Sequence, residues 1–380
     1  MKKEQTAAKD PTDSRKKSGK KGMNPVVAII VIGVVAALAA VLWVKFGRFV
    51  QAANSVQWLE ANLYSMEFKG DYGFDKFIEG GGADSDNAVG QFVAGYLTGG
   101  LYRYQGKIDA APFGCSVFNT KNKAGDVLIG RNFDWEDSAV MLVRTSPKNG
   151  YASVSTCCVN FLGFGKDYVP NNTMAERFKA LAAIYAPVDG MNEKGLIVAD
   201  LMAGDKEATH QKTDKPDLTT TTALRLLLDR AATVDEAVAL LEQYDMNSSV
   251  DFAHHFAIAD ASGKSVAVEY VNNKMVVTET PVLTNHYLAK EKGKNGGEQS
   301  HARFDLLQKF LGKTLEGAEV AGVMENVAQK NYEQKDGEPH VTLWTWVYSP
   351  KAKMAMFYHH ENFRHAFRVS ILTDTWVSEH

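Results

Sequence analysis

An uninterrupted apolar segment near the N-terminus most strongly limits how this chain can fold. Residues 25–44 carry no charged side chain and consist mostly of Val, Ile, Ala and Leu. A helix of this length rises about 30 Å, which is enough to span the hydrocarbon core of a bilayer. Trp43 and Phe46 lie at its C-terminal rim, where aromatic side chains favour the membrane interface. The sequence therefore predicts a transmembrane helix over 23–46.

The charges that flank this segment predict its orientation. Residues 1–22 contain eight Lys or Arg against three Asp or Glu and almost nothing apolar, which is typical of a disordered basic tail. Only Lys45 and Arg48 are basic shortly after the segment. This asymmetry predicts a single-pass protein of the cell membrane with a cytoplasmic N-terminus and an extracellular catalytic domain. A cleaved signal peptide with a small-residue site near 50–53 is the alternative, although secretory apolar regions are usually shorter.

The rest of the composition is that of an ordinary globular protein. Hydrophobic residues make up 45% and charged residues 23%, and the net charge of −3 gives no basis for a nucleic-acid partner. The three cysteines are too few for a disulfide framework. Cys157 and Cys158 are adjacent in an apolar stretch, as buried small side chains often are. Cys115 is the cysteine that needs an explanation.

Periodicity along the chain predicts an α+β fold in which helices pack on antiparallel sheets. Residues 47–65 and 87–97 have helical spacing and are separated by glycine runs, so 47–114 is expected to be a helical leader and 115–380 the main domain. Further helices are predicted over 219–232, 234–244, 301–311 and 316–329. Strands are predicted over 115–118, 126–130, 139–145, 151–158, 195–201, 256–259, 266–271, 275–280, 341–349, 353–359 and 366–372.

The first predicted hairpin brings together side chains that can do chemistry. If its turn centres near residue 123, Cys115 pairs with Arg131, and Asp134 follows three residues later. An Arg beside a cysteine favours the thiolate and lowers the thiol pKa. The carboxylate could hold the Arg or orient a nearby amine. A surface Arg–Asp pair beside a buried cysteine remains an open alternative at this point.

Five sequence blocks together resemble the choloylglycine hydrolase and penicillin V acylase family. Arg131 and Asp134 stand 16 and 19 residues after Cys115, as the corresponding residues do in that family. The blocks are Phe113-Gly114-Cys115-Ser116, Gly130-Arg131-Asn132-Phe133-Asp134, Gly190-Met191-Asn192-Glu193-Lys194-Gly195-Leu196, Leu283-Thr284-Asn285 and Ala302-Arg303-Phe304. The resemblance implies an N-terminal-nucleophile αββα sandwich that hydrolyses linear amides of small molecules, such as conjugated bile salts, penicillin V or N-acyl amino acids. It implies neither a cofactor nor a metal.

The resemblance also implies a mechanism. Cleavage between Gly114 and Cys115 would expose an α-amine whose pKa of about 7.7–8.0 lets it accept the thiol proton. Asp134 would orient that amine, and Arg131 and Arg303 would stabilise negative charge. Asn285 would donate to the oxyanion through its side chain. The backbone N–H at Met202 is the second candidate donor.

Two departures from the family pattern and two alternative functions accompany this interpretation. Relatives often begin at the cysteine, whereas 114 residues precede it here, and Met202 stands where relatives often have Asn or Tyr. A Cys–His hydrolase without self-cleavage is one alternative, and a membrane-anchored binding protein with an inactive hydrolase fold is another. The histidines considered for the former are His254, His255, His286, His301 and His340. The polar segment 204–217 is either a rim of the substrate pocket or a solvated loop.

Overall fold

The computed structural model describes residues 25–107, 114–204, 207–293, 295–330, 332–333, 339–373 and 376–379. The predicted basic tail over 1–22 lies outside these residues. The chain divides into two compact units, Met1–Lys45 and Phe46–His380.

Helix α1 (Pro25–Asn54) contains the apolar segment. By length and composition it could cross a membrane, although a signal sequence would meet the same criterion. The helix runs past the predicted end at 46 because Phe49, Ala52 and Ala53 are buried within the second unit. Burial of these side chains stabilises the last turns of the helix.

The second unit contains seven further α-helices among the described residues, together with short 3₁₀ turns. The α-helices are α2 (Phe74–Glu79), α3 (Asp86–Thr98), α4 (Met174–Ala180), α5 (Thr220–Arg230), α6 (Val234–Leu241), α7 (Glu298–Gln308) and α8 (Gly317–Asn326). The 3₁₀ turns are η1 (Val159–Leu162), η2 (Leu181–Tyr185), η3 (Ser249–Asp251) and η4 (Lys290–Lys292). The predicted helices after residue 200 are all present, with ends that differ by a few residues.

The strands form two large sheets and one small pair. The nine-stranded sheet has the order β1 (Gln57–Glu60), β2 (Leu63–Lys69), β5 (Val140–Ser146), β6 (Ser153–Cys158), β7 (Asp189–Asn192), β8 (Ile197–Met202), β11 (His254–Ala259), β12 (Ser265–Val271) and β13 (Lys274–Glu279). The eight-stranded sheet has the order β14 (Val282–Leu283), β3 (Gly114–Lys121), β4 (Val127–Trp135), β16 (Pro339–Ser349), β17 (Met354–His359), β18 (Ala366–Ser370) and β19 (Trp376–Glu379), with β15 (Tyr332–Glu333) paired to β16. The small pair is β9 (Asp217–Thr219) with β10 (Asp245–Asn247).

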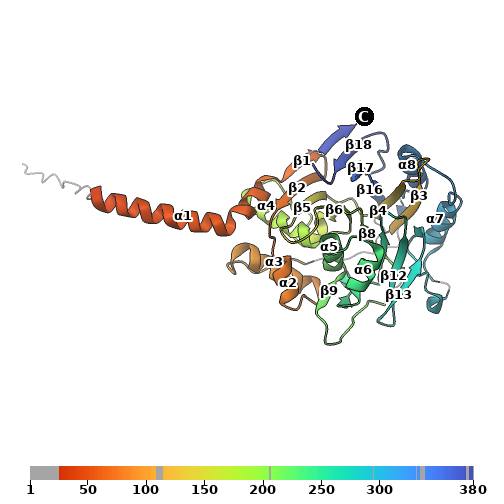
Figure 1. Ribbon diagram of the computed structural model, residues 1–380, viewed down its shortest axis with the longest axis horizontal. Coiled ribbons are helices and arrows are strands. Elements are labelled where there is room, and N and C mark those ends of the chain that lie inside the picture. The colour runs from red at the N-terminus through yellow and green to blue at the C-terminus, as the bar shows by residue number, and fades with distance from the viewer. Residues whose placement is uncertain are drawn as a thin grey trace, which may run out of the picture. The chain divides into compact units, whose positions relative to one another are not determined.

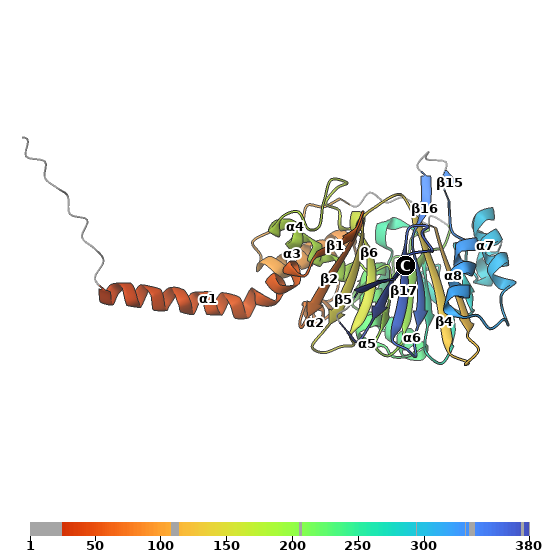
Figure 2. The same cartoon turned by 90° about the horizontal axis from the view of Figure 1, so that it is seen from above.

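The two large sheets pack face to face between helical layers, as an αββα sandwich requires (Figures 1 and 2). Helices α2 to α6 cover the outer face of the nine-stranded sheet, and α7 and α8 cover that of the other. Strand β5 shows why the sequence folds in this way: Met141 and Val143 point toward the helices, whereas Val140 and Leu142 point toward the facing sheet. A strand buried on both faces reads as an unbroken apolar run.

The segment 47–114 is not the purely helical leader that its spacing suggests. After α1 ends at Asn54, residues 57–60 and 63–69 form the edge strands β1 and β2, and β2 pairs parallel to β5 (Figure 1). Tyr64, Met66 and Phe68 alternate toward the helical layer, which is strand periodicity. The expectation of wholly antiparallel sheets is therefore wrong at this edge.

The β3–β4 hairpin has a register two residues away from the predicted one. Cys115 lies opposite Phe133, and Arg131 lies opposite Val117. The turn lies over 122–126, so it centres on Ala124 instead of residue 123. Because side chains alternate with a period of two, this shift leaves Cys115 and Arg131 on the same face of the sheet.

Candidate functional site

The five predicted site residues gather at one end of the β3–β4 hairpin, although they come from four separate elements. Cys115 lies on β3, and Arg131 and Asp134 lie on β4. Asn285 follows β14, which pairs with β3, and Arg303 lies on α7. Gly114, the residue before the proposed cleavage point, lies opposite Asp134 in the hairpin. The side chains of Cys115, Arg131 and Asp134 are fully buried.

The Arg303 guanidinium joins three of these residues. Its Nη1 donates to the Cys115 carbonyl oxygen at 2.6 Å and to Asp134 Oδ2 at 3.1 Å. Its Nη2 donates to Asn285 Oδ1 at 2.9 Å. The planar fork of an Arg side chain suits such directed contacts better than a lysine ammonium would. Arg303 therefore fixes the backbone of Cys115 relative to the Asn285 and Asp134 side chains.

The Asn285 amide lies between two backbone segments. Its Oδ1 accepts from the Cys115 N–H at 2.6 Å, and its Nδ2 donates to the Met202 carbonyl oxygen at 2.8 Å. Asn285 and the Met202 backbone are thus neighbours, and their contact uses the carbonyl oxygen of Met202.

Arg131 approaches Cys115 from β4 and also binds the facing sheet. Its Nη2 donates to the Asp200 carbonyl oxygen at 2.8 Å, and its Nε lies 3.3 Å from Asp189 Oδ2. The Cys115 thiol is directed at the same Asp200 oxygen, with Sγ 3.7 Å from it. Arg131 is also hydrogen-bonded to the Cys115 thiol. Strands β7 and β8 of the facing sheet therefore help to hold the thiol and the guanidinium together.

Burial, more than the nearby Arg, sets the acidity of the thiol in this arrangement. Desolvation raises the pKa of Cys115 to about 12, and Arg131 only partly opposes that rise. Burial likewise raises the pKa of Asp134, against the lowering effects of Arg303 and the hydroxyl of Thr342. The expected thiolate-favouring effect of Arg131 is present, but desolvation outweighs it.

The histidines considered for a Cys–His mechanism mostly have other hydrogen-bond partners. His254 and His255, adjacent on β11, point to opposite faces and bind Asp200 and Glu269, respectively. The second ring nitrogen of His254 lies 2.9 Å from the Ser249 carbonyl oxygen. The hydrogen bonds of His286 and His301 go to Ser300 and to the Asn295 carbonyl oxygen, and His340 is buried beside β15. In the described part of the chain, no three His, Cys, Asp or Glu side chains are placed to share a metal ion.

Sequence reasoning missed three residues that support this cluster. Asp189 and Asp200 contact Arg131, and Thr342 Oγ1 donates to Asp134 Oδ1 at 2.6 Å. Asp189 directly precedes the family-like block that starts at Gly190, so extending that block by one residue would have found it. Asp200 acts through its backbone carbonyl, and Thr342 comes from a distant strand. Neither carries a sequence pattern that could have revealed it.

Comparison with known proteins gives matches of three kinds. The sequence profile of the acyl-coenzyme A:6-aminopenicillanic acid acyl-transferase family matches residues 119–364. Penicillin V acylase of Pectobacterium atrosepticum is 31% identical over 127 residues, or 30% of this chain and 34% of the relative. The match thus spans about a third of that curated relative. Arg131, Asp134, Asn285 and Arg303 lie inside the profile match, and Cys115 lies just before it.

Solved structures share the fold of the second unit. Two variants of conjugated bile acid hydrolase from Clostridium perfringens superpose with TM-scores of 0.52 and 0.51 at 16% and 17% identity. Each match covers 70% of this chain and 96% of the other. These likenesses confirm the expected N-terminal-nucleophile αββα fold.

Proposed function

The chain belongs to the acyl-coenzyme A:6-aminopenicillanic acid acyl-transferase family, and on this basis we propose that it hydrolyses linear amides with Cys115 as its nucleophile. The observation that carries the proposal is the cluster around Arg303. A single guanidinium contacts the Cys115 carbonyl oxygen and the Asp134 and Asn285 side chains. It thereby holds the backbone of the proposed nucleophile beside an amide and a carboxylate that can take part in acyl transfer.

Maturation is the first proposed reaction. The Cys115 thiol adds to the Gly114 carbonyl carbon, the Gly114–Cys115 C–N bond breaks, and the acyl group moves to sulfur as a thioester. Water then hydrolyses this thioester, which leaves a carboxylate on Gly114 and a free α-amine and thiol on Cys115. The Gly114 carbonyl oxygen carries negative charge during the addition, and Arg303 and Asn285 are the nearby donors that can stabilise that charge.

Turnover repeats the same chemistry on an external amide. The new α-amine takes the thiol proton, and Sγ adds to the substrate carbonyl carbon. Asn285 and the Met202 backbone N–H stabilise the oxyanion, and the protonated α-amine gives its proton to the departing amine. Water activated by the α-amine then hydrolyses the thioester and releases the acid. Asp134, within reach of Gly114, holds the α-amine in place.

The proposal includes a location. Helix α1 anchors the protein in the cell membrane as a single-pass span, with residues 1–22 in the cytoplasm and the αββα unit outside. The asymmetric charge of the flanks supports this orientation. The substrate is then a small-molecule amide that is present outside the membrane.

Intact mass and N-terminal sequencing of the full chain, beside Cys115→Ala, test this function. A new N-terminus at Cys115 in the parent alone, together with hydrolysis of penicillin V or an N-acyl amino acid, is the expected result. Cleavage without hydrolysis of any amide would favour the inactive binding protein. Hydrolysis by an uncut chain would favour the Cys–His mechanism.

A further inference from the structure

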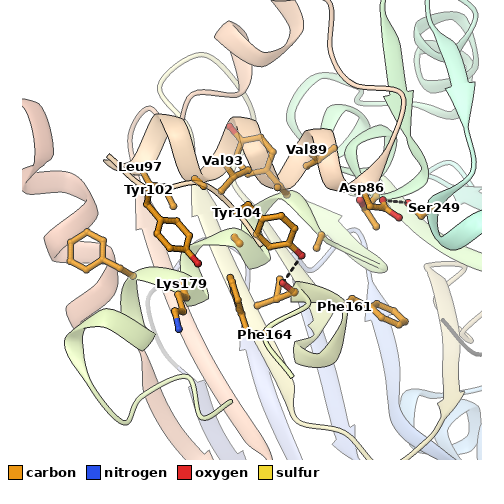
Figure 3. A pocket seen from close by; sticks show the side chains of 18 of the residues that line it. Asp86, Val89, Val93, Leu97, Tyr102, Tyr104, Phe161, Phe164, Lys179 and Ser249 are labelled. Atoms are coloured by element: carbon orange, nitrogen blue, oxygen red, sulfur yellow. Dashed lines mark hydrogen bonds between the residues drawn. The ribbon is translucent and has the colours of Figure 1, made fainter. Parts of the chain in front are cut away.

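A large apolar cavity lies between the leader and the sandwich. Its volume is about 440 Å³, within the range of about 300–1,000 Å³ that is usual for small-molecule sites. The leader side is formed by α3 and the residues after it, including Val89, Val93, Leu97 and Tyr104 (Figure 3). Phe161 and Phe164 are among the residues on the opposite side. A lining of this kind is poorly suited to water, because water needs several polar partners.

One end of the cavity lies near the proposed nucleophile, although Cys115 itself is fully buried and is not part of the lining. Asp200 and His254 belong to the lining, and the Asp200 carbonyl oxygen lies 3.7 Å from Cys115 Sγ. Phe161, also in the lining, packs against Phe133, the cross-strand partner of Cys115. An acyl group attached to Sγ would therefore have the apolar space next to it.

The leader wall is held in a defined position. Asp86, at the start of α3, accepts hydrogen bonds from Ser249 Oγ at 2.8 Å and from the Val250 N–H at 2.9 Å. The Tyr104 hydroxyl donates to the Leu162 carbonyl oxygen at 3.0 Å, and Figure 3 shows both the Asp86 and the Tyr104 contacts. A Cβ at Gly90 would lie 2.4 Å from the Tyr104 ring, so only glycine lets the ring pack this closely on α3.

We propose that this cavity binds an aliphatic acyl chain of the amide substrate and that leader helix α3 determines how long that chain can be. The proposal rests on the proposed function. Of the charged side chains in the lining, Asp86, Asp200 and His254 are hydrogen-bonded to protein partners, and Lys179 lies over the Phe164 ring. Most of the remaining lining is apolar and favours an uncharged chain. The leader lies outside the 119–364 family match, so the family profile does not describe this wall. It follows that the leader must remain bound after cleavage.

Amides of one chromogenic amine with acetyl, hexanoyl, decanoyl and palmitoyl groups test the proposal. In the parent, kcat/KM should rise from acetyl to decanoyl. Val93→Phe fills part of the cavity from the leader side, and we expect it to lower kcat/KM for the decanoyl amide about tenfold or more while leaving the acetyl amide unchanged. Asn87→Phe, on an exposed position of the same helix, is the matched control and should match the parent. The proposal would be overturned if the parent had the same kcat/KM for all acyl chain lengths. It would also be overturned if Val93→Phe lowered kcat/KM equally for all the substrates.

A binding measurement separates this inference from the proposed activity. Calorimetry of decanoate with full-length Cys115→Ala should detect binding that Val93→Phe weakens in the same background. If no amide is turned over but decanoate binds in this way, the proposed function fails and the apolar site stands. If amides are turned over but decanoate does not bind, the inference fails alone. Should Val93→Phe not fold, Ala182→Phe fills the cavity from the opposite wall.

Discussion

Asp134 occupies the space that a side chain at position 114 would need. The two residues face each other across the β3–β4 hairpin, and a Cβ added to Gly114 would lie 3.0 Å from Asp134 Oδ2 and 3.1 Å from Asp134 Cβ. The missing side chain therefore allows the buried carboxylate to approach the peptide bond that precedes Cys115. The sequence predicted only where the cleavage would occur, whereas the structure identifies a specific neighbour of that bond.

Gly114→Val should slow maturation strongly, and Gly114→Ala should slow it less. Each added carbon must displace either the backbone of β3 or the Asp134 side chain, which Thr342 and Arg303 hold in place. The fraction of cut chain over time, measured by intact mass, checks the order. Gly95→Ala, on α3 with nothing near its added Cβ, is the control and should mature like the parent. Normal cleavage in Gly114→Val would show that the close approach is irrelevant.

Arg303→Lys should reduce kcat of the mature enzyme by about 10²-fold or more, a loss similar to removal of one oxyanion donor in other enzymes. A lysine keeps the charge but cannot contact Cys115, Asp134 and Asn285 at the same time. Steady-state kinetics should show the loss mainly in kcat, because these contacts involve reacting groups and not the acyl chain. Arg368→Lys, half exposed and paired with Glu379, should change neither constant. A full rescue by lysine would mean that charge alone suffices.

The rate of self-cleavage should rise with pH. Since burial raises the pKa of Cys115 to about 12 in the uncut chain, the thiol is almost wholly protonated near neutrality. Below that pKa the thiolate fraction grows about tenfold per pH unit, and the thiolate is the nucleophile. Precursor made by cell-free synthesis and moved to about pH 7, 8 and 9 should therefore mature progressively faster. A plateau above pH 7 would instead indicate a neighbouring base, as a Cys–His mechanism requires.

Tyr72→Phe should destabilise the protein by about 1–3 kcal/mol, because it removes a donor from a buried carboxylate. The Tyr72 hydroxyl donates to Asp229 Oδ1 at 2.6 Å, and Asp229 also pairs with Arg225 at 2.7 Å. This contact joins the leader to α5. Chemical denaturation measures the change, with half-exposed Tyr244→Phe as the control. An unchanged free energy of unfolding would show that the leader contact contributes nothing.

The fragments of a cut parent should remain together. Size-exclusion chromatography under native conditions should give a single peak that contains both chains, which separate only on a denaturing gel. The reason is burial: Phe49, Met66, Phe68 and Phe77 of the leader are each at most 1% exposed. Their burial would be lost on separation, at about 1.5–3 kcal/mol for each large side chain. Elution of the second chain alone would also contradict the proposed acyl-chain site.

The fold class and the convergence of the first three candidate side chains could be predicted from the sequence, and for these side chains the reason is local. Cys115, Arg131 and Asp134 belong to one hairpin, so an approximate register already brings them together. The register was wrong by two residues because the turn over 122–126 centres on Ala124, one residue later than assumed. Only a register error of an odd number of residues would have moved the Arg131 side chain to the face of the sheet opposite Cys115.

What the sequence could not reveal depends on contacts between distant segments. Strand β2 has a clear alternating pattern, but only its pairing with β5 shows that the leader belongs to the sheet. The segment 204–217 was a candidate rim of the substrate pocket. Among the described residues, however, α3 contributes to the lining of the apolar cavity and that segment does not. The sequence also could not show that desolvation raises the pKa of the Cys115 thiol more than Arg131 lowers it, because this balance depends on the burial of the thiol in the folded protein.

The parallel pairing of β2 with β5 has a consequence for assembly. A cut after Gly114 would place β2 and α1 on one polypeptide and β5 and Cys115 on another. The catalytic polypeptide would then have no covalent bond to α1. Under the proposed anchoring, strand pairing and packing alone would keep it at the membrane. Once denatured, the mature pair would have to find each other by diffusion, so recovery would depend on protein concentration, whereas the precursor folds as a single chain. Maturation would thus change folding from a unimolecular to a bimolecular process.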